Sequence, residues 1–97
     1  METVYLDHDN VVDLQLLIDK QPADLSAVTK MELVFDEVVI SSSDYPDVFD
    51  WSEGNGIVHI KLYGVPIERK YYDARLIVYD GSTPHGIVWG VVPMLVR

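Results

Sequence analysis

The second half of the chain alternates apolar and polar residues, and this alternation constrains the fold more than any other feature. In residues 56–63, Val58, Ile60 and Leu62 would lie on one face of an extended segment, with the residues between them on the other. Successive side chains of a β-strand point to opposite faces of a sheet, so a period of two is the pattern of a half-buried strand. Residues 72–80 repeat this pattern, and the face that they would bury consists of Ala74, Leu76 and Val78. The two segments predict a sheet with one face turned to a core.

Residues 11–18 carry a weaker form of the same pattern. The face that they would bury consists of the even positions Val12, Leu14, Leu16 and Ile18. The spacing of Leu14, Leu17 and Ile18 also fits a helix, but Pro22 leaves too little room for one. We therefore predict a strand here, with a shorter strand before it at residues 3–6.

A β-hairpin is predicted over residues 29–42. The core face of its first strand consists of Met31, Leu33 and Phe35. Asp36-Glu37 then provides a tight connection to a second apolar run that begins at Val38. A further short strand is expected at residues 48–51.

The end of the chain is predicted to close the sheet. Residues 80–86 contain glycine, serine and proline, so we expect a loop there, followed by a last strand from Ile87 onward. Pro93 has no main-chain donor, which predicts that this strand lies at a sheet edge or carries a bulge. The segments together give about seven or eight short strands, at the spacing typical of an antiparallel β-sandwich.

The size and composition fit a single compact domain. A chain of 97 residues is expected to form one domain over residues 1–97, and folding would bury roughly 65% of its unfolded surface. The sequence contains no cysteine. This excludes a disulfide framework, thiolate catalysis and cysteine-ligated zinc.

The charge of the chain excludes other classes of function. Sixteen acidic residues against seven basic ones give a formal net charge of -9. Such a field repels phosphate backbones, so nucleic acid is not an expected partner. The N-terminus lacks a basic segment followed by an apolar run, and no apolar stretch approaches the ~20 residues that a membrane helix requires. We expect a soluble, uncleaved protein without a membrane partner.

Two acidic groups resemble metal sites only superficially. Asp7-His8-Asp9 gathers three metal-type ligands, but neighbouring residues of a strand point in opposite directions, so a turn is favoured over an ion site. The second group consists of Asp44, Asp47, Asp50 and Glu53. It matches a calcium loop in charge alone, because an EF-hand needs ligands at alternate positions and a glycine at the sixth. We predict no metal and no cofactor, and leave open whether this acidic loop binds a divalent ion.

No group of residues has the pattern of an enzyme active site. The histidines His8, His59 and His85 lie far apart in the sequence, and each is interpreted as a polar surface residue. Ser41 to Ser43 lie in no nucleophile-elbow motif. We therefore predict no catalytic residue.

Aromatic residues on the outward faces of the predicted strands form the best candidate site. Exposed tyrosine and tryptophan favour protein interfaces or sugar stacking. The candidate partner-binding residues are Tyr63, Ile77, Tyr79 and Trp89. As an alternative, Tyr45 and Trp51 would bind a sugar beside the acidic loop. For each aromatic residue a position in the core stays open, because both sheets of a sandwich need large buried side chains.

Three stretches follow one another in a distinctive order. The first is Asp-Leu-Ser-Ala-Val-Thr at residues 24–29, which leads into the predicted hairpin. Phe-Asp-Trp at residues 49–51 then precedes Gly-Ile-Val-His-Ile-Lys-Leu at residues 56–62, and Tyr-Asp-Ala-Arg-Leu-Ile-Val-Tyr-Asp follows at residues 72–80. This order resembles that of small immunoglobulin-like structural or accessory proteins of tailed bacteriophages and prophages. The resemblance spans residues 11–92.

The resemblance implies an immunoglobulin-like antiparallel β-sandwich with a noncatalytic role in a virion or in its assembly. Its partners would be phage structural proteins or further copies of the chain, and a homo-oligomer is expected. Its location would be the virion, or the cytoplasm of the bacterial host during assembly. Such families have no catalytic residues to carry over. Because the chain ends at Arg97 without a shaft or receptor-binding domain, we do not expect a tail fibre. The alternative function is a carbohydrate-binding β-sandwich module.

Overall fold

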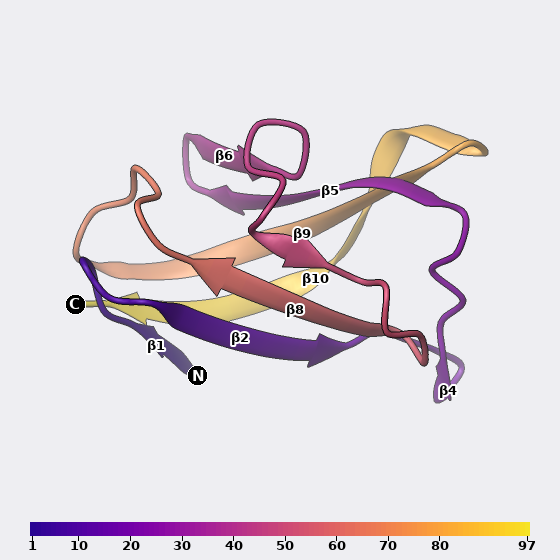
Figure 1. Ribbon diagram of the computed structural model, residues 1–97, viewed down its shortest axis with the longest axis horizontal. Coiled ribbons are helices and arrows are strands. Elements are labelled where there is room, and N and C mark those ends of the chain that lie inside the picture. The colour runs from indigo at the N-terminus through magenta and orange to yellow at the C-terminus, as the bar shows by residue number, and fades with distance from the viewer.

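The computed structural model describes residues 1–97 as strands, turns and loops (Figure 1). The ten strands are β1 (Glu2–Val4), β2 (Asn10–Gln15), β3 (Leu17–Ile18), β4 (Gln21–Pro22), β5 (Val28–Phe35), β6 (Val38–Ser41), β7 (Phe49–Asp50), β8 (Ile57–Leu62), β9 (Tyr71–Asp80) and β10 (Thr83–Val96). None of its elements is a helix that could cross a membrane. The prediction of an all-β fold is confirmed.

Two sheets enclose one hydrophobic core. The larger sheet has five strands in the order β1-β10-β9-β5-β6, and the smaller has three in the order β2-β8-β7. The strands β3 and β4 pair separately as a small hairpin. In Figure 1, β2 and β8 lie in front of β10. A single cluster of 23 buried residues drawn from both sheets fills the space between them, which is the arrangement of a β-sandwich.

The alternation places the core where the sequence predicts it. Nine residues that the alternation assigned to the core are buried: Val58, Ile60 and Leu62 of β8, Ala74, Leu76 and Val78 of β9, and Met31, Leu33 and Phe35 of β5. The hairpin over residues 29–42 is also confirmed, because β5 pairs with β6 across a turn in which Asp36 has a φ of 52°. Burial of a large aliphatic side chain contributes about 1.5–3 kcal/mol, so these residues dominate the stabilisation of the sandwich.

Residues 11–18 differ from the predicted single strand. They contain all of β2 after Asn10 and all of β3, which turns away to pair with β4. The turn is made by Asp19 and Lys20, whose φ values of 50° and 68° lie in the left-handed region. Ile18 was expected in the core but is 56% exposed, because the chain leaves the sheet after the buried Leu16.

The predicted loop over residues 80–86 is shorter than expected, because β10 already begins at Thr83. The Asp80 side chain explains the tight turn. Its Oδ1 accepts hydrogen bonds from the main-chain N–H groups of Ser82 and Thr83, both at 2.9 Å. An aspartate that bonds its own main chain in this way reverses the chain without further loop residues.

The irregularities of β10 lie before Pro93 rather than at it. The register shifts between Thr83 and Ile87 and again between Val88 and Gly90, so that Trp89 is the extra residue of a bulge. On its other side β10 pairs only with β1, which runs parallel to it over residues 94–96. The expectation of purely antiparallel sheets is therefore wrong for this pair. Pro93 lies just outside the segment of β10 that pairs with β1. Its main chain is therefore at an open edge, which tolerates a residue without a donor.

Candidate functional site

The outer face of the five-stranded sheet carries exposed apolar side chains from several strands. One row of cross-strand partners consists of Val91, Arg75, Val34 and Val39, and the next of Val88, Ile77 and Glu32. Val88 and Val91 are each 55% exposed, and Val39 is 46% exposed. Ile77 and Tyr79 of β9 are half-buried on the same face. We call Val39, Ile77, Tyr79, Val88 and Val91 the outer patch.

Polar contacts fix Tyr79 at one end of the outer patch. Its hydroxyl donates a hydrogen bond to the carboxylate of Glu32, and the ammonium of Lys30 lies 4.2 Å from the centre of its ring. Lys30 Nζ is also 3.6 Å from Glu32 Oε2. The hydrogen bond to Glu32 is the main cause that raises the pKa of the Tyr79 hydroxyl. The hydroxyl therefore stays protonated and continues to donate.

Gly86 lets Ile77 and Tyr79 pack directly on the main chain of β10. Its φ is +80°, a conformation that glycine adopts readily and other residues rarely do. A β-carbon at this position would lie 2.7 Å from side-chain atoms of both Ile77 and Tyr79. The absence of a side chain at Gly86 thus shapes this end of the outer patch.

The structure brings together only part of the candidate set. Ile77 and Tyr79 share the outer face of β9. Trp89 lies at the bulge, half-buried and packed against the hydrophobic core. Tyr63 follows β8 of the other sheet and is 66% exposed. Trp89 and Tyr63 are thus not part of the outer patch. Val88 and Val91, which were not selected from the sequence, lie beside Ile77 and Tyr79 instead.

Main-chain groups of β10 are left unpaired along its outer edge, because β1 covers only its C-terminal end. The N–H of Val96 donates to the carbonyl of Lys70, which lies on the β9 side. Main-chain groups alternate sides along a strand, so Val91 and Pro93 point theirs away from β9. Val88 lies opposite Ile77, and Val91 lies opposite Arg75. The extra residue of the bulge shifts the alternation by one position, so Val88 has the same orientation as Val91. The main-chain groups of Val88 and Val91 therefore both face the open edge.

This edge carries no formal charge. From Gly81 to Val96 the only titratable side chain is His85, although the whole chain has a net charge of -9. Natural proteins commonly protect an edge strand with charged side chains, prolines or bulges. Here Pro84 and Pro93 limit the open segment at its two ends and a bulge bends it, but charged side chains are absent from the strand.

The two residues of the alternative sugar site lie in different hollows. Tyr45 lines a groove of about 430 Å³ together with Tyr63, Lys61 and three aspartates. Trp51 lines another hollow, of about 320 Å³, beside Leu25. The structure does not bring Tyr45 and Trp51 together. It pairs Tyr45 with Tyr63, which the sequence assigned to the partner-binding set.

His59 lies between two carboxylates on the outer face of the three-stranded sheet. Its Nδ1 is 2.6 Å from Oδ1 of Asp13 on β2, and its Nε2 is 2.9 Å from Oε1 of Glu53. The hydrogen bond with Asp13, followed by that with Glu53, raises the pKa of His59. Asp50 of β7 is its other cross-strand partner. Both ring nitrogens contact carboxylates, so this group joins β2, β8 and the loop before β8.

The fold separates the four residues of the acidic loop into two pairs. Asp44 and Asp47 line the groove that contains Tyr45, whereas Asp50 and Glu53 lie near His59. The structure has no group of three or more carboxylate, histidine or cysteine side chains arranged to hold a metal ion. The interpretation of His59 as an ordinary surface residue missed its two contacts. The signal that reveals them is the register of β2 with β8, which pairs residues that are 46 positions apart.

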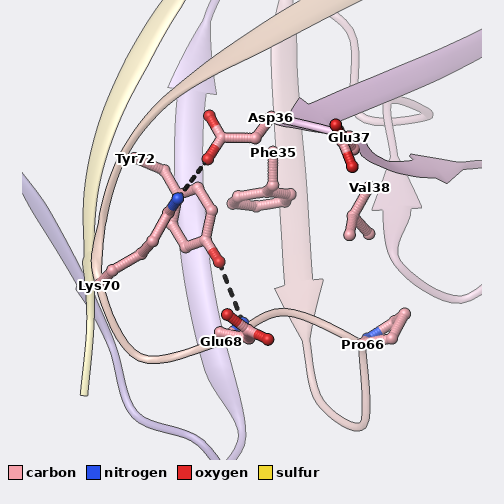
Figure 2. A pocket seen from close by; sticks show the side chains of 8 residues that line it. All are labelled: Phe35, Asp36, Glu37, Val38, Pro66, Glu68, Lys70 and Tyr72. Carbon is pink, nitrogen blue, oxygen red and sulfur yellow. Dashed lines mark hydrogen bonds and ion pairs between the residues drawn. The ribbon is translucent and has the colours of Figure 1, made fainter.

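A further hollow, of about 400 Å³, lies where the β5–β6 turn meets the connection from β8 to β9 (Figure 2). Lys70 forms an ion pair with Asp36 at 2.5 Å, and the Tyr72 hydroxyl accepts a hydrogen bond from the main-chain N–H of Glu68 at 3.0 Å. The buried Tyr72 ring meets Phe35 edge to face, with centroids 5.3 Å apart. These contacts bind two loops together at one end of the sandwich.

Comparison with known proteins adds no assignment. No protein-family model, curated protein or solved structure matches the chain. The function is therefore argued from the surfaces described above.

Proposed function

We propose that the chain is a noncatalytic structural or assembly module that acts through protein–protein contacts made by the outer patch. One observation carries the proposal: exposed Val88 and Val91 coincide with an uncharged strand edge whose main-chain groups are unpaired. Such an edge allows a partner to add a β-strand, while the adjacent valines supply an apolar contact. A long apolar edge that solvent alone covers is otherwise a liability for a protein.

We also propose an immunoglobulin-like sandwich in a tailed phage or prophage. The strand order supports the fold: β10-β9-β5-β6 corresponds to strands G, F, C and C′ of a variable-type domain, and β2-β8-β7 to strands B, E and D. The phage setting rests on the resemblance of the three sequence stretches. There the protein belongs to the virion or acts in the host cytoplasm during assembly, bound to phage structural proteins or to itself.

The test is to co-express the chain with each structural protein encoded beside its gene and to measure complexes by light scattering after gel filtration. The test variant combines Val39→Asp with Arg75→Glu, two exposed positions of the outer face. The matched control is Val11→Asp on β2 of the other sheet, where the valine is 59% exposed. We expect a roughly tenfold loss of affinity, about 1.4 kcal/mol, in the test variant alone. Equal binding by all three proteins would contradict the proposal.

A carbohydrate-binding module is the second candidate, and the groove between Tyr45 and Tyr63 favours it. Two tyrosine rings with three aspartates offer stacking surfaces and hydrogen-bond acceptors to a sugar. Binding on a glycan array that Tyr63→Ala abolishes and Trp51→Ala leaves intact would support this function at the groove. An array without any bound glycan would exclude it for the sugars tested.

A further inference from the structure

We infer that the partner at the open edge of β10 is a second copy of the chain, paired antiparallel with Val88 of each copy opposite Val91 of the other. This inference rests on the proposed function, in which the outer patch is a contact surface. The pairing joins the five-stranded sheets of two copies into one continuous sheet across a two-fold axis. The axis passes beside the bulge at Trp89.

The bulge makes this register possible. Because Trp89 is an extra residue, Val88 and Val91 are spaced along the edge like alternate residues of a regular strand. Both direct their main-chain N–H and C=O toward the open edge, so each Val88–Val91 pair exchanges two hydrogen bonds. Both side chains lie on the outer face, where the opposed valines of the two copies come into contact.

Because β10 carries no formal charge, its edge fits a partner surface that is also uncharged. The same edge on a second copy is such a surface. A basic partner is attracted to the acidic regions of the chain, but β10 itself offers it no carboxylate. The like charges in the rows that meet at this edge are the two Arg75 side chains, one on β9 of each copy. Three strand spacings separate them, about 14 Å, which exceeds the Debye length of about 8 Å at physiological salt. Two copies with a charge of -9 each can therefore meet at this edge with little direct repulsion.

The same geometry limits the assembly to two copies. A two-fold contact uses the β10 edge of both copies and leaves no free β10 edge for a third. The pairing ends at Pro93, which cannot donate a main-chain hydrogen bond, because β1 already covers the edge of Met94–Val96 in each copy. The opposite edge of the sheet is the four-residue strand β6, which the pairing does not use.

The first test measures the mass of the full chain by light scattering after gel filtration across a concentration series. The inference predicts a mass that rises from 11.0 kDa to twice that value. In Val91→Asp we expect the dissociation constant to rise at least tenfold, because a carboxylate is buried against an apolar strand. The control Val11→Asp adds the same charge to an exposed valine on β2, another edge strand, and should leave the constant unchanged. A monomer at every concentration, a trimer, or equal losses in both variants would overturn the inference.

A second test reports the register of the two β10 strands. The chain contains no cysteine, so an introduced cysteine can form a disulfide only with another introduced cysteine. Directly opposed, hydrogen-bonded residues have Cα atoms about 5.5 Å apart, within the range that a disulfide spans. We expect a mixture of Val88→Cys and Val91→Cys chains to oxidise to a disulfide-linked pair. Each variant alone should cross-link several times more slowly, because its own copies are diagonal neighbours about 7–8 Å apart. Equal rates in the mixture and in the separate variants would overturn this register.

The two proposals can fail separately. If the wild-type chain is a monomer and the mixed cysteine variants do not cross-link, self-pairing is wrong. Retained binding to a neighbouring structural protein, lost in the Val39→Asp/Arg75→Glu variant, would then leave the proposed function in place. Loss of both self-pairing and binding would overturn both.

Discussion

The two sheets of the sandwich turn different surfaces to solvent. On the three-stranded sheet, His59 lies between the carboxylates of Asp13 and Glu53, with the charges of Asp50 and Lys61 nearby. On the five-stranded sheet, the outer patch exposes three valines beside a strand without formal charge. Charged groups thus surround His59 on the three-stranded sheet, whereas the five-stranded sheet places exposed valines beside unpaired main chain, with Arg75 and Glu32 among them.

This difference separates what the fold requires from what a function adds. Burial of one face is required of both sheets, and the same alternation provides it in β8 and in β9. The outward residues are free of that requirement, so a contrast between the two outer faces carries information about contacts. The charge-free β10 in a chain of net charge -9 is the clearest case.

The largest expected effect is that of a substitution at Gly56, which directly precedes β8, and it is compared with the same substitution at Gly86 in β10. A β-carbon at Gly56 would lie 2.4 Å from the main-chain oxygen of Leu16, whereas one at Gly86 would meet the side chains of Ile77 and Tyr79 at 2.7 Å. Main chain yields less than side chains, so we expect Gly56→Ala to lower the free energy of unfolding by about 3 kcal/mol or more. Gly86→Ala should cost about 2 kcal/mol, including the strain of a positive φ. Urea unfolding followed by tryptophan fluorescence measures both.

Gly64→Ala is the matched control for this pair. Gly64 has a φ of +68° but open space around its missing side chain, so only the backbone strain remains, about 1 kcal/mol. The expected order of destabilisation is Gly56, Gly86, Gly64. If Gly56→Ala costs no more than Gly64→Ala, the close approach of the two main-chain segments at Leu16 does not exist in solution.

A smaller effect concerns the polar support of the outer patch. Tyr79→Phe keeps the ring but removes the hydroxyl that donates to Glu32, and we expect the free energy of unfolding to fall by about 1 kcal/mol. Glu32 is largely shielded from water, with 15% of its side chain exposed, so solvent replaces the lost donor poorly. Chemical unfolding of the two proteins in the same buffer checks this value.

Tyr71→Phe provides the comparison on the same strand. Its hydroxyl donates to Asp73 at 2.6 Å, but both residues are exposed, so water can replace the hydrogen bond. We expect the change in the free energy of unfolding to be much smaller than that of Tyr79→Phe. A loss as large as that of Tyr79→Phe would show that burial of Glu32 does not distinguish the two sites.

Local patterns in the sequence predicted the core residues of both sheets. They did not predict which outward side chains of neighbouring strands lie together. The positions of Val58 in β8 and Met31 in β5 follow from a period of two, which needs no knowledge of the neighbouring strands. The error at Ile18 has a local cause, because the chain leaves the sheet after Leu16 and Leu17–Ile18 pairs instead with Gln21–Pro22 across the turn at Asp19 and Lys20. A strand of two residues is too short to show a period of its own, so the sequence alone does not separate Leu17–Ile18 from the strand before it.

The candidate site depends on pairings that a single sequence does not contain. Val88 joins Ile77 only because of the bulge at Trp89, and Asp13 meets His59 only because β2 pairs with β8 in one register. A shift of one residue would turn every side chain of a strand to the other face. Selecting outward residues one by one therefore found Ile77 and Tyr79 on a shared face, but it missed the valines of the neighbouring strands.

The smallest expected effect tests the charged face of the three-stranded sheet by pH. The contacts with Asp13 and Glu53 raise the pKa of His59 above its ordinary value of 6.5. A folded pKa above the unfolded one means that the native state binds the proton more tightly. The stabilisation is therefore complete below pH 6.5 and is lost as the pH rises through the folded pKa. We expect the urea midpoint of the wild-type protein to fall over this interval, and that of His59→Gln to change less.

Two variants show whether the carboxylates cause this dependence. Asp13→Asn and Glu53→Gln each keep a polar group near the ring but remove one negative charge, so each should lower the pKa of His59 measured by proton NMR titration. The larger drop is expected for Asp13→Asn, because its hydrogen bond is the first cause of the raised pKa. Val91→Asp on the opposite sheet should leave the His59 titration unchanged, since it lies on the other outer face. An NMR pKa of His59 at or below 6.5 in the wild-type protein would show that the ring does not lie between these carboxylates in solution.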